Sequence, residues 1–151
     1  MDTVSGTPPW AYTLQLAHDP RAPRIARATL RAILHTYELD ELTPTAELLT
    51  SELVTNAHLH GGSNGPYGLR IAPRPNGRLR VGVWDANPQI PPPFTDPHPP
   101  FTDPRPPLTT NPTAPGGRGL LLLGACADRY GAYTLRTPGK YLWAECGAAR
   151  T

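Results

Sequence analysis

The stretch Glu52-Leu-Val-Thr-Asn56-Ala-His-Leu-His60-Gly61 decides how this sequence is interpreted. At helical periodicity, Glu52, Asn56 and His60 fall at i, i+4 and i+8, so their side chains project from one face about a turn apart. The other faces carry apolar residues that the helix can bury while it presents this stripe to a cavity, namely Leu48, Leu49, Leu53 and Val54. The alternative is a solvent-exposed helix face, which composition alone favours, because most charged side chains are simply exposed.

Both ends of this helix carry local signals. Thr43-Pro44 predicts its start, with a capping hydroxyl followed by a proline at the first helical position. Gly61-Gly62 predicts its end, because glycine tolerates the backbone conformation that terminates many helices. The predicted helix therefore covers residues 43–60.

Two elements are predicted before this helix. Apolar residues alternate over 10–16, which is typical of a strand with one buried face. Residues 22–37 have helical periodicity. We expect the buried stripe of this first helix to be formed by Ile25, Ala28, Ala32 and Ile33.

Most of the second half of the chain is predicted to form β-hairpins. Residues 67–71 and 79–85 alternate on either side of a Pro-Asn-Gly turn, which predicts an antiparallel hairpin that ends at Asp85. A buried helix over 120–127 and a hairpin of 130–135 with 140–146 close the chain. This order predicts an α/β two-layer sandwich, with a mixed, mostly antiparallel sheet and helices on one face.

The segment 88–115 interrupts this pattern. It contains twelve prolines in 28 positions, a density that excludes regular helix and inner strand. Long loops in compact domains are usually functional lids or disordered insertions. We expect a mobile, semi-rigid arm of polyproline type, and its repeated Phe-Thr-Asp-Pro units suggest a contact with a partner.

A second candidate site begins where this segment ends. Gly117, Arg118 and Gly119 precede Leu120 and the apolar helix, and glycines at a helix start let the backbone N–H groups approach a phosphate. Arg118 adds donors suited to phosphate, although a flexible turn with an exposed arginine explains the same residues. Asp85, at a strand end, is either an exposed turn residue or an acceptor for the exocyclic amine of a purine.

Composition narrows the class of protein. A chain of 151 residues is the size of one domain, taken here as 1–151. The net charge of +2 with a single lysine, Lys140, argues against a strongly electrostatic nucleic-acid binder. The longest apolar run is far shorter than the ~20 residues that span a bilayer, and the N-terminus has no signal-peptide pattern. We therefore expect a cytoplasmic protein in which Cys126 and Cys146 are free buried thiols.

The three signals in this order resemble the N-box and the two glycine boxes of the GHKL ATPase superfamily: Glu52 to Gly61, then Val83-Trp-Asp85, then Gly117-Arg-Gly119-Leu120. Within it, the chain is most similar to the anti-sigma-factor serine/threonine kinase branch, small RsbW/SpoIIAB-like proteins, in the form typical of actinobacteria. The likeness covers nearly the whole chain and implies the Bergerat ATP-binding fold, with residues 88–115 as the ATP lid.

The resemblance also implies roles. Asn56 would coordinate Mg²⁺ that bridges the phosphates of ATP, and Glu52 would be the general base. His60 would lie near the phosphates and Asp85 would hold the adenine amine. The phosphate-facing end of the lid would be formed by Gly117, Arg118, Gly119 and Leu120. The implied reaction is transfer of the γ-phosphate to a serine or threonine of a STAS-type anti-sigma antagonist, with a sigma factor as a further partner and a homodimer as a further possibility.

Two departures from the family pattern bear on whether the chain binds nucleotide and transfers phosphate. The first glycine box, usually Asp-x-Gly-x-Gly, is Asp85-Ala-Asn87-Pro88 here, and the lid is unusually rich in proline. A non-catalytic module that binds nucleotide and recruits a partner is therefore the alternative function. The isolated ATPase domain of a histidine kinase is disfavoured, because no helix with a phosphoacceptor histidine precedes residue 20. The remaining histidines are expected to be surface or packing residues: His18, His35, His58 and His98.

Overall fold

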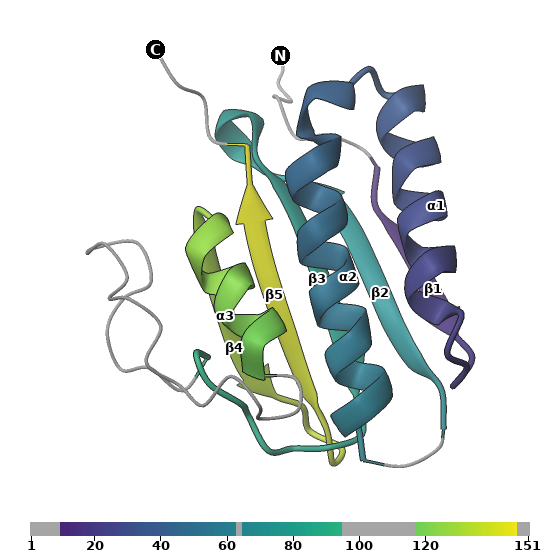
Figure 1. Ribbon diagram of the computed structural model, residues 1–151, viewed down its shortest axis with the longest axis vertical. Helices are drawn as coiled ribbons and strands as arrows, with labels where there is room; N and C mark the ends of the chain where they lie inside the picture. The colour runs from purple at the N-terminus through teal and green to yellow at the C-terminus, as the bar shows by residue number, and fades with distance from the viewer. Residues whose placement is uncertain (1–9, 63–64, 95–116, 148–151) are drawn as a thin grey trace.

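The computed structural model describes residues 10–62, 65–94 and 117–147 (Figure 1). Their strands form one sheet in the order β1-β2-β3-β5-β4, and every neighbouring pair is antiparallel. The strands are β1 (Tyr12–Leu16), β2 (Tyr67–Pro73), β3 (Leu79–Asp85), β4 (Arg129–Thr134) and β5 (Lys140–Cys146). The helices α1 (Ala22–Thr36), α2 (Thr43–His60) and α3 (Gly117–Cys126) cover one face, which confirms the predicted two-layer sandwich (Figure 1).

The middle helix, α2, lies over the sheet with its apolar face in the core. Leu49, Leu53, Val54 and Ala57 are at most 1% exposed, whereas Leu48 is only half-buried. The helix ends at Gly61, and Gly62 follows with φ of +100°, a conformation that a glycine adopts without a steric penalty. The predicted end of the helix is therefore confirmed.

The predicted cap at the start of α2 is wrong. A 3₁₀ turn, η1 (Asp40–Leu42), leads directly into the helix, so Thr43 already has helical dihedral angles. The capping position falls on Leu42, and no side chain caps the helix. Pro44 still lies in the first turn, where its missing N–H costs nothing.

The predicted stripe of α1 is also wrong at three of four positions. Ile25 is 50% exposed, and Ala28 and Ala32 are exposed as well. The buried residues are Ala22, Ala26, Leu30, Ile33 and Leu34. The observed stripe buries three large apolar side chains, Leu30, Ile33 and Leu34, whereas the predicted stripe has two, so the observed rotation of the helix removes more apolar surface from water.

The face of the sheet without helices is packed by aromatic rings that lie over glycines. The Trp84 ring covers Gly68, where a Cβ atom would overlap it, and Tyr141 covers Gly82 in the same way. Arg80 places its guanidinium 3.9 Å from the ring centroid of Trp143 and forms an ion pair with buried Glu145. Side chains of the sheet itself therefore cover this face.

The start of the proline-rich segment is attached to the domain. Ile90 and Phe94 pack against the core, and the Phe94 ring meets Tyr130 edge to face, with 5.4 Å between centroids. Ile90 and Phe94 thus anchor the start of this segment to the core, whereas Pro88, Gln89 and Pro92 are exposed, and the mobility of the arm stays a prediction. Apart from Phe94, the repeated Phe-Thr-Asp-Pro units and the remainder of the predicted lid lie outside the described residues.

Both cysteines are free, as predicted, but only Cys146 is buried. Its burial raises the pKa of the thiol to about 12, which keeps it protonated at neutral pH. Cys126, at the end of α3, is exposed, so the expectation of two buried thiols is wrong. Among the helices of the described residues, none is long and apolar enough to cross a membrane.

Gly68→Ala should destabilise the domain by about 1–3 kcal/mol, because the added methyl group forces the Trp84 ring off the sheet. Urea unfolding followed by fluorescence measures this loss. The matched control is Gly124→Ala in α3, where the new Cβ meets its nearest atom, Cγ of Pro93, at 3.4 Å. The free energy of unfolding of that variant should equal or exceed that of wild type, since alanine favours helix more than glycine does. Equal stability of the two variants would contradict the close-approach argument.

Candidate functional site

The polar stripe of α2 is turned inward, not exposed to solvent. Asn56 is 4% exposed, and Glu52 and His60 are half-buried. Within the described residues, Oδ1 of Asn56 and Nε2 of His60 are buried and have no hydrogen-bond partner. Because an unpaired buried polar atom costs free energy, such atoms mark positions where a ligand can complete the bonding. The alternative of an exposed polar face is wrong.

Glu52 lies two turns before His60 on this stripe. Burial raises the pKa of its carboxyl group above the ordinary 4.5, because desolvation disfavours the charged form. A carboxylate with a raised pKa is a stronger proton acceptor than an ordinary one. Glu52 is therefore chemically suited to act as a base.

Asp85 is buried at the end of β3 instead of lying in an exposed turn. Its carboxylate accepts a hydrogen bond at Oδ1 from Nζ of Lys140, at 2.9 Å, and another at Oδ1 from the backbone N–H of Asn87, also at 2.9 Å. Burial raises the pKa of Asp85, and the lysine opposes that change. Both contacts use Oδ1, so Oδ2 takes part in neither.

Lys140 is a site residue that sequence reasoning missed. It starts β5, lies opposite Asp85 in the antiparallel register and is 1% exposed. Its ammonium also donates to the carbonyl oxygen of Asn87, at 3.1 Å. The available signal was a single lysine at the start of an apolar strand, next to a predicted turn.

Asn87 joins the end of β3 to the end of α2. Its Nδ2 donates to the carbonyl oxygen of His60, at 2.8 Å, and so satisfies a carbonyl group at the helix end. Close packing supports the same junction, because a Cβ on Gly61 would lie 3.2 Å from Cβ of Asp85. The residue that departs from the glycine box thus has a structural role that brings Asp85 next to the α2 stripe.

The start of α3 lies at this end of the molecule. Helix α3 runs antiparallel to α2, since Cys126 at its end lines a shallow hollow with Leu42 and Thr45 (Figure 1). Gly117, Arg118 and Gly119 form its first residues, and their side-chain positions lie outside the described part. The side chain of Leu120 is in the core, 3% exposed, so its contact with a ligand could only come from the backbone.

Three of the other histidines, His18, His35 and His58, have packing or surface positions, as expected. His18 stacks on His58, with 4.2 Å between ring centroids, and Nδ1 of His58 lies 3.0 Å from the Tyr67 hydroxyl. His35 is exposed beside Asp40. His98 lies outside the described residues.

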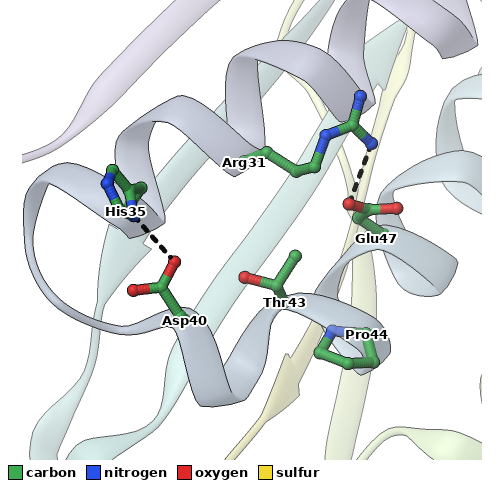
Figure 2. A pocket seen from close by; sticks show the side chains of 6 residues that line it. All are labelled: Arg31, His35, Asp40, Thr43, Pro44 and Glu47. Carbon is green, nitrogen blue, oxygen red and sulfur yellow. Dashed lines mark hydrogen bonds and ion pairs between the residues drawn. The ribbon is translucent and has the colours of Figure 1, made fainter.

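A separate hollow of about 610 Å³ lies at the opposite end of α2 (Figure 2). Its walls carry two ion pairs, Arg31 with Glu47 at 2.9 Å and His35 with Asp40 at 3.1 Å. Thr43 and Pro44 complete the lining. None of the predicted site residues contributes to it, and its charged groups already pair with one another.

Comparison with known families matches residues 16–145 to the histidine kinase-like ATPase domain. The chain belongs to this family. An uncharacterized protein of Streptomyces coelicolor is 35% identical over 81 residues, which cover 54% of this chain and 66% of that protein. The chain thus matches slightly less than two thirds of that relative.

The fold of this histidine kinase-like ATPase domain is also found in a solved structure. The crystal structure of the RsbU and RsbW domains of Rv1364c from Mycobacterium tuberculosis superimposes with a TM-score of 0.64 and 19% identity. The alignment covers 95% of this chain and 34% of the other. Family membership supports the GHKL assignment and implies ATP as the bound nucleotide.

Lys140→Met should destabilise the histidine kinase-like ATPase domain by about 3–5 kcal/mol, because it leaves the Asp85 carboxylate buried without its counter-charge. Urea unfolding gives the value. Adding Asp85→Asn to the same chain should recover most of the loss. The control is Arg31→Met, which removes an exposed ion pair and should cost about 1 kcal/mol or less. A Lys140→Met domain as stable as wild type would disprove this account of the pair.

Proposed function

We propose that ATP binds between the C-terminal half of α2, the end of β3 and the start of α3. The observation that carries this is the inward α2 stripe, with Oδ1 of Asn56 and Nε2 of His60 buried and unpartnered beside the Asp85 junction. Asp85 would accept a hydrogen bond from the adenine amine. His60 and the backbone of Gly117, Arg118, Gly119 and Leu120 would face the phosphates, because a helix start favours anions.

The amide oxygen of Asn56 would hold Mg²⁺. A magnesium ion prefers oxygen ligands and is commonly held by one or two protein groups together with phosphates. The described residues hold no cluster of three or more His, Cys, Asp and Glu that could bind a metal alone, which fits a site completed by the nucleotide. When bound, the ion would neutralise phosphate charge.

The proposed reaction is phosphoryl transfer with Glu52 as the general base. Its carboxylate would take the proton of a serine or threonine hydroxyl, the hydroxyl oxygen would bond to the γ-phosphorus, and the bond to the bridging oxygen of ADP would break. The raised pKa of Glu52 makes it a stronger proton acceptor than an exposed glutamate. Most of the rate would come from positioning and charge neutralisation.

The substrate we propose is a STAS-type anti-sigma antagonist, with a sigma factor as a second partner, so that the protein is a cytoplasmic regulator of transcription. Support comes from the likeness to the RsbW-like branch and from the fold shared with a structure that contains an RsbW domain. Homodimer formation, the single domain over 1–151 and the lid role of the proline-rich segment remain predictions.

A non-catalytic nucleotide-binding regulator is the second candidate. The departure of the glycine box from the family pattern, to Asp85-Ala-Asn87-Pro88, motivates this candidate. In that case nucleotide would act as a conformational ligand and not as a phosphate donor.

Asn56→Ala and Asp85→Asn should each lower the affinity for Mg-ATP by about tenfold or more, because the first removes a buried amide of the site and the second replaces an acceptor oxygen of the carboxylate with an NH2 donor. Calorimetric titration measures this at a temperature where circular dichroism shows each variant folded. Asp40→Asn, in the opposite hollow, is the matched control and should bind as wild type does. Unchanged affinity in both site variants would place the nucleotide elsewhere.

Glu52→Gln should bind ATP within a few-fold of wild type but lose about 10²–10⁴-fold in turnover, because a base acts on transfer and not on affinity. The wild-type rate should fall on acidification through the raised pKa of Glu52, with its midpoint above 4.5, and the glutamine variant should lack this limb. Phosphate release and partner phosphorylation measured across pH test both points. Full activity in Glu52→Gln excludes this base, and a wild type that binds ATP without turnover favours the non-catalytic regulator.

A further inference from the structure

The buried pair of Asp85 and Lys140 has more hydrogen-bonding capacity than its own contacts use. A lysine ammonium carries three N–H donors, and the described contacts use two, one to Oδ1 of Asp85 and one to the carbonyl oxygen of Asn87. On the aspartate, Oδ1 takes both bonds, from Lys140 and from the backbone of Asn87. One N–H of Lys140 and the acceptor Oδ2 of Asp85 are therefore left over from these bonds.

This arrangement is fixed by the backbone, not by a flexible side chain. Asp85 and Lys140 are opposite residues in the β3–β5 ladder, and the side chains are 3% and 1% exposed. Gly61 packs against Cβ of Asp85 from the α2 side, and the Asn87 turn closes the end of the strand. The pair is held in place before any ligand binds, so little side-chain entropy would be lost on recognition.

The edge of adenine matches such a pair. Its exocyclic amine at C6 is a donor and the adjacent ring nitrogen N1 is an acceptor, and proteins commonly read bases by hydrogen bonds to this edge. We propose that Lys140 is a base-reading residue, whose remaining N–H is donated to N1 of adenine, directly or through one water, while Oδ2 of Asp85 accepts from the amine. This inference rests on the proposed ATP site and adds a specificity determinant to it.

A purely structural role for Lys140 makes a different prediction. If the lysine only compensated the charge of Asp85, removing it would weaken binding of every adenine nucleotide alike. A donor to N1 instead produces a loss that depends on one atom of the ligand. The two roles are therefore separated by changing the ligand and not only the protein.

The experiment titrates wild type and Lys140→Met with Mg²⁺ complexes of ATP, 1-deaza-ATP, which lacks N1, and 7-deaza-ATP, which keeps it. Wild type should bind 1-deaza-ATP about tenfold more weakly than ATP, the usual order for a hydrogen bond to a charged group, and 7-deaza-ATP like ATP. In Lys140→Met the difference between ATP and 1-deaza-ATP should disappear. The double variant Asp85→Asn/Lys140→Met provides a charge-neutral background for the same comparison.

Wild type that binds 1-deaza-ATP as tightly as ATP would overturn the inference, and this comparison does not require any variant to fold. A tenfold difference that persists in Lys140→Met, or in the double variant where the single one is unfolded, would overturn it as well. Tighter binding of inosine triphosphate than of ATP would show that the donor faces a carbonyl at C6 and not N1. Wild type that binds none of these nucleotides would refute the proposed function itself, a result distinct from ATP binding without discrimination.

Discussion

The packing of α2 against the sheet is the contact on which the candidate site depends. Eighteen residues of one helix supply both the centre of the core and the inward polar stripe. Leu53 and Val54 fix the rotation of the helix over the sheet, and that rotation turns Asn56 toward the protein interior. Any change that lets α2 rotate would expose the polar stripe and bury nothing in return.

The end of α2 shows how the site is completed by residues far apart in sequence. Asn87 satisfies the last turn of the helix, while its backbone groups contact Asp85 and Lys140. One turn therefore connects helix α2 with strands β3 and β5. Asn87 stands where the family usually has glycine. Its side chain donates a hydrogen bond to the end of α2, which a glycine cannot do, and this accounts for the change.

The sequence predicted most of this molecule through local signals. Alternating and helical periodicity identified the strands and helices, and the spacing of Glu52, Asn56 and His60 placed three residues on one face, because both depend only on neighbours along the chain. The α1 stripe and the Thr43 cap failed where tertiary packing decided between two locally reasonable solutions. Lys140 and Asn87 could not be assigned from local spacing, since their roles arise from the register of β3 with β5 and from the contact of β3 with α2.

Lys140 is the single lysine of the chain, and it is buried. The surface of the folded domain consequently offers no lysine amine to acylating reagents or to lysine-modifying enzymes, although thirteen arginines keep it cationic. Covalent chemistry at a side-chain amine would therefore report on one place only, the junction of Asp85, Asn87 and the end of α2. Because Lys140 is shielded in the folded domain, its acylation would require this junction to open, and the rate of acylation would measure that opening.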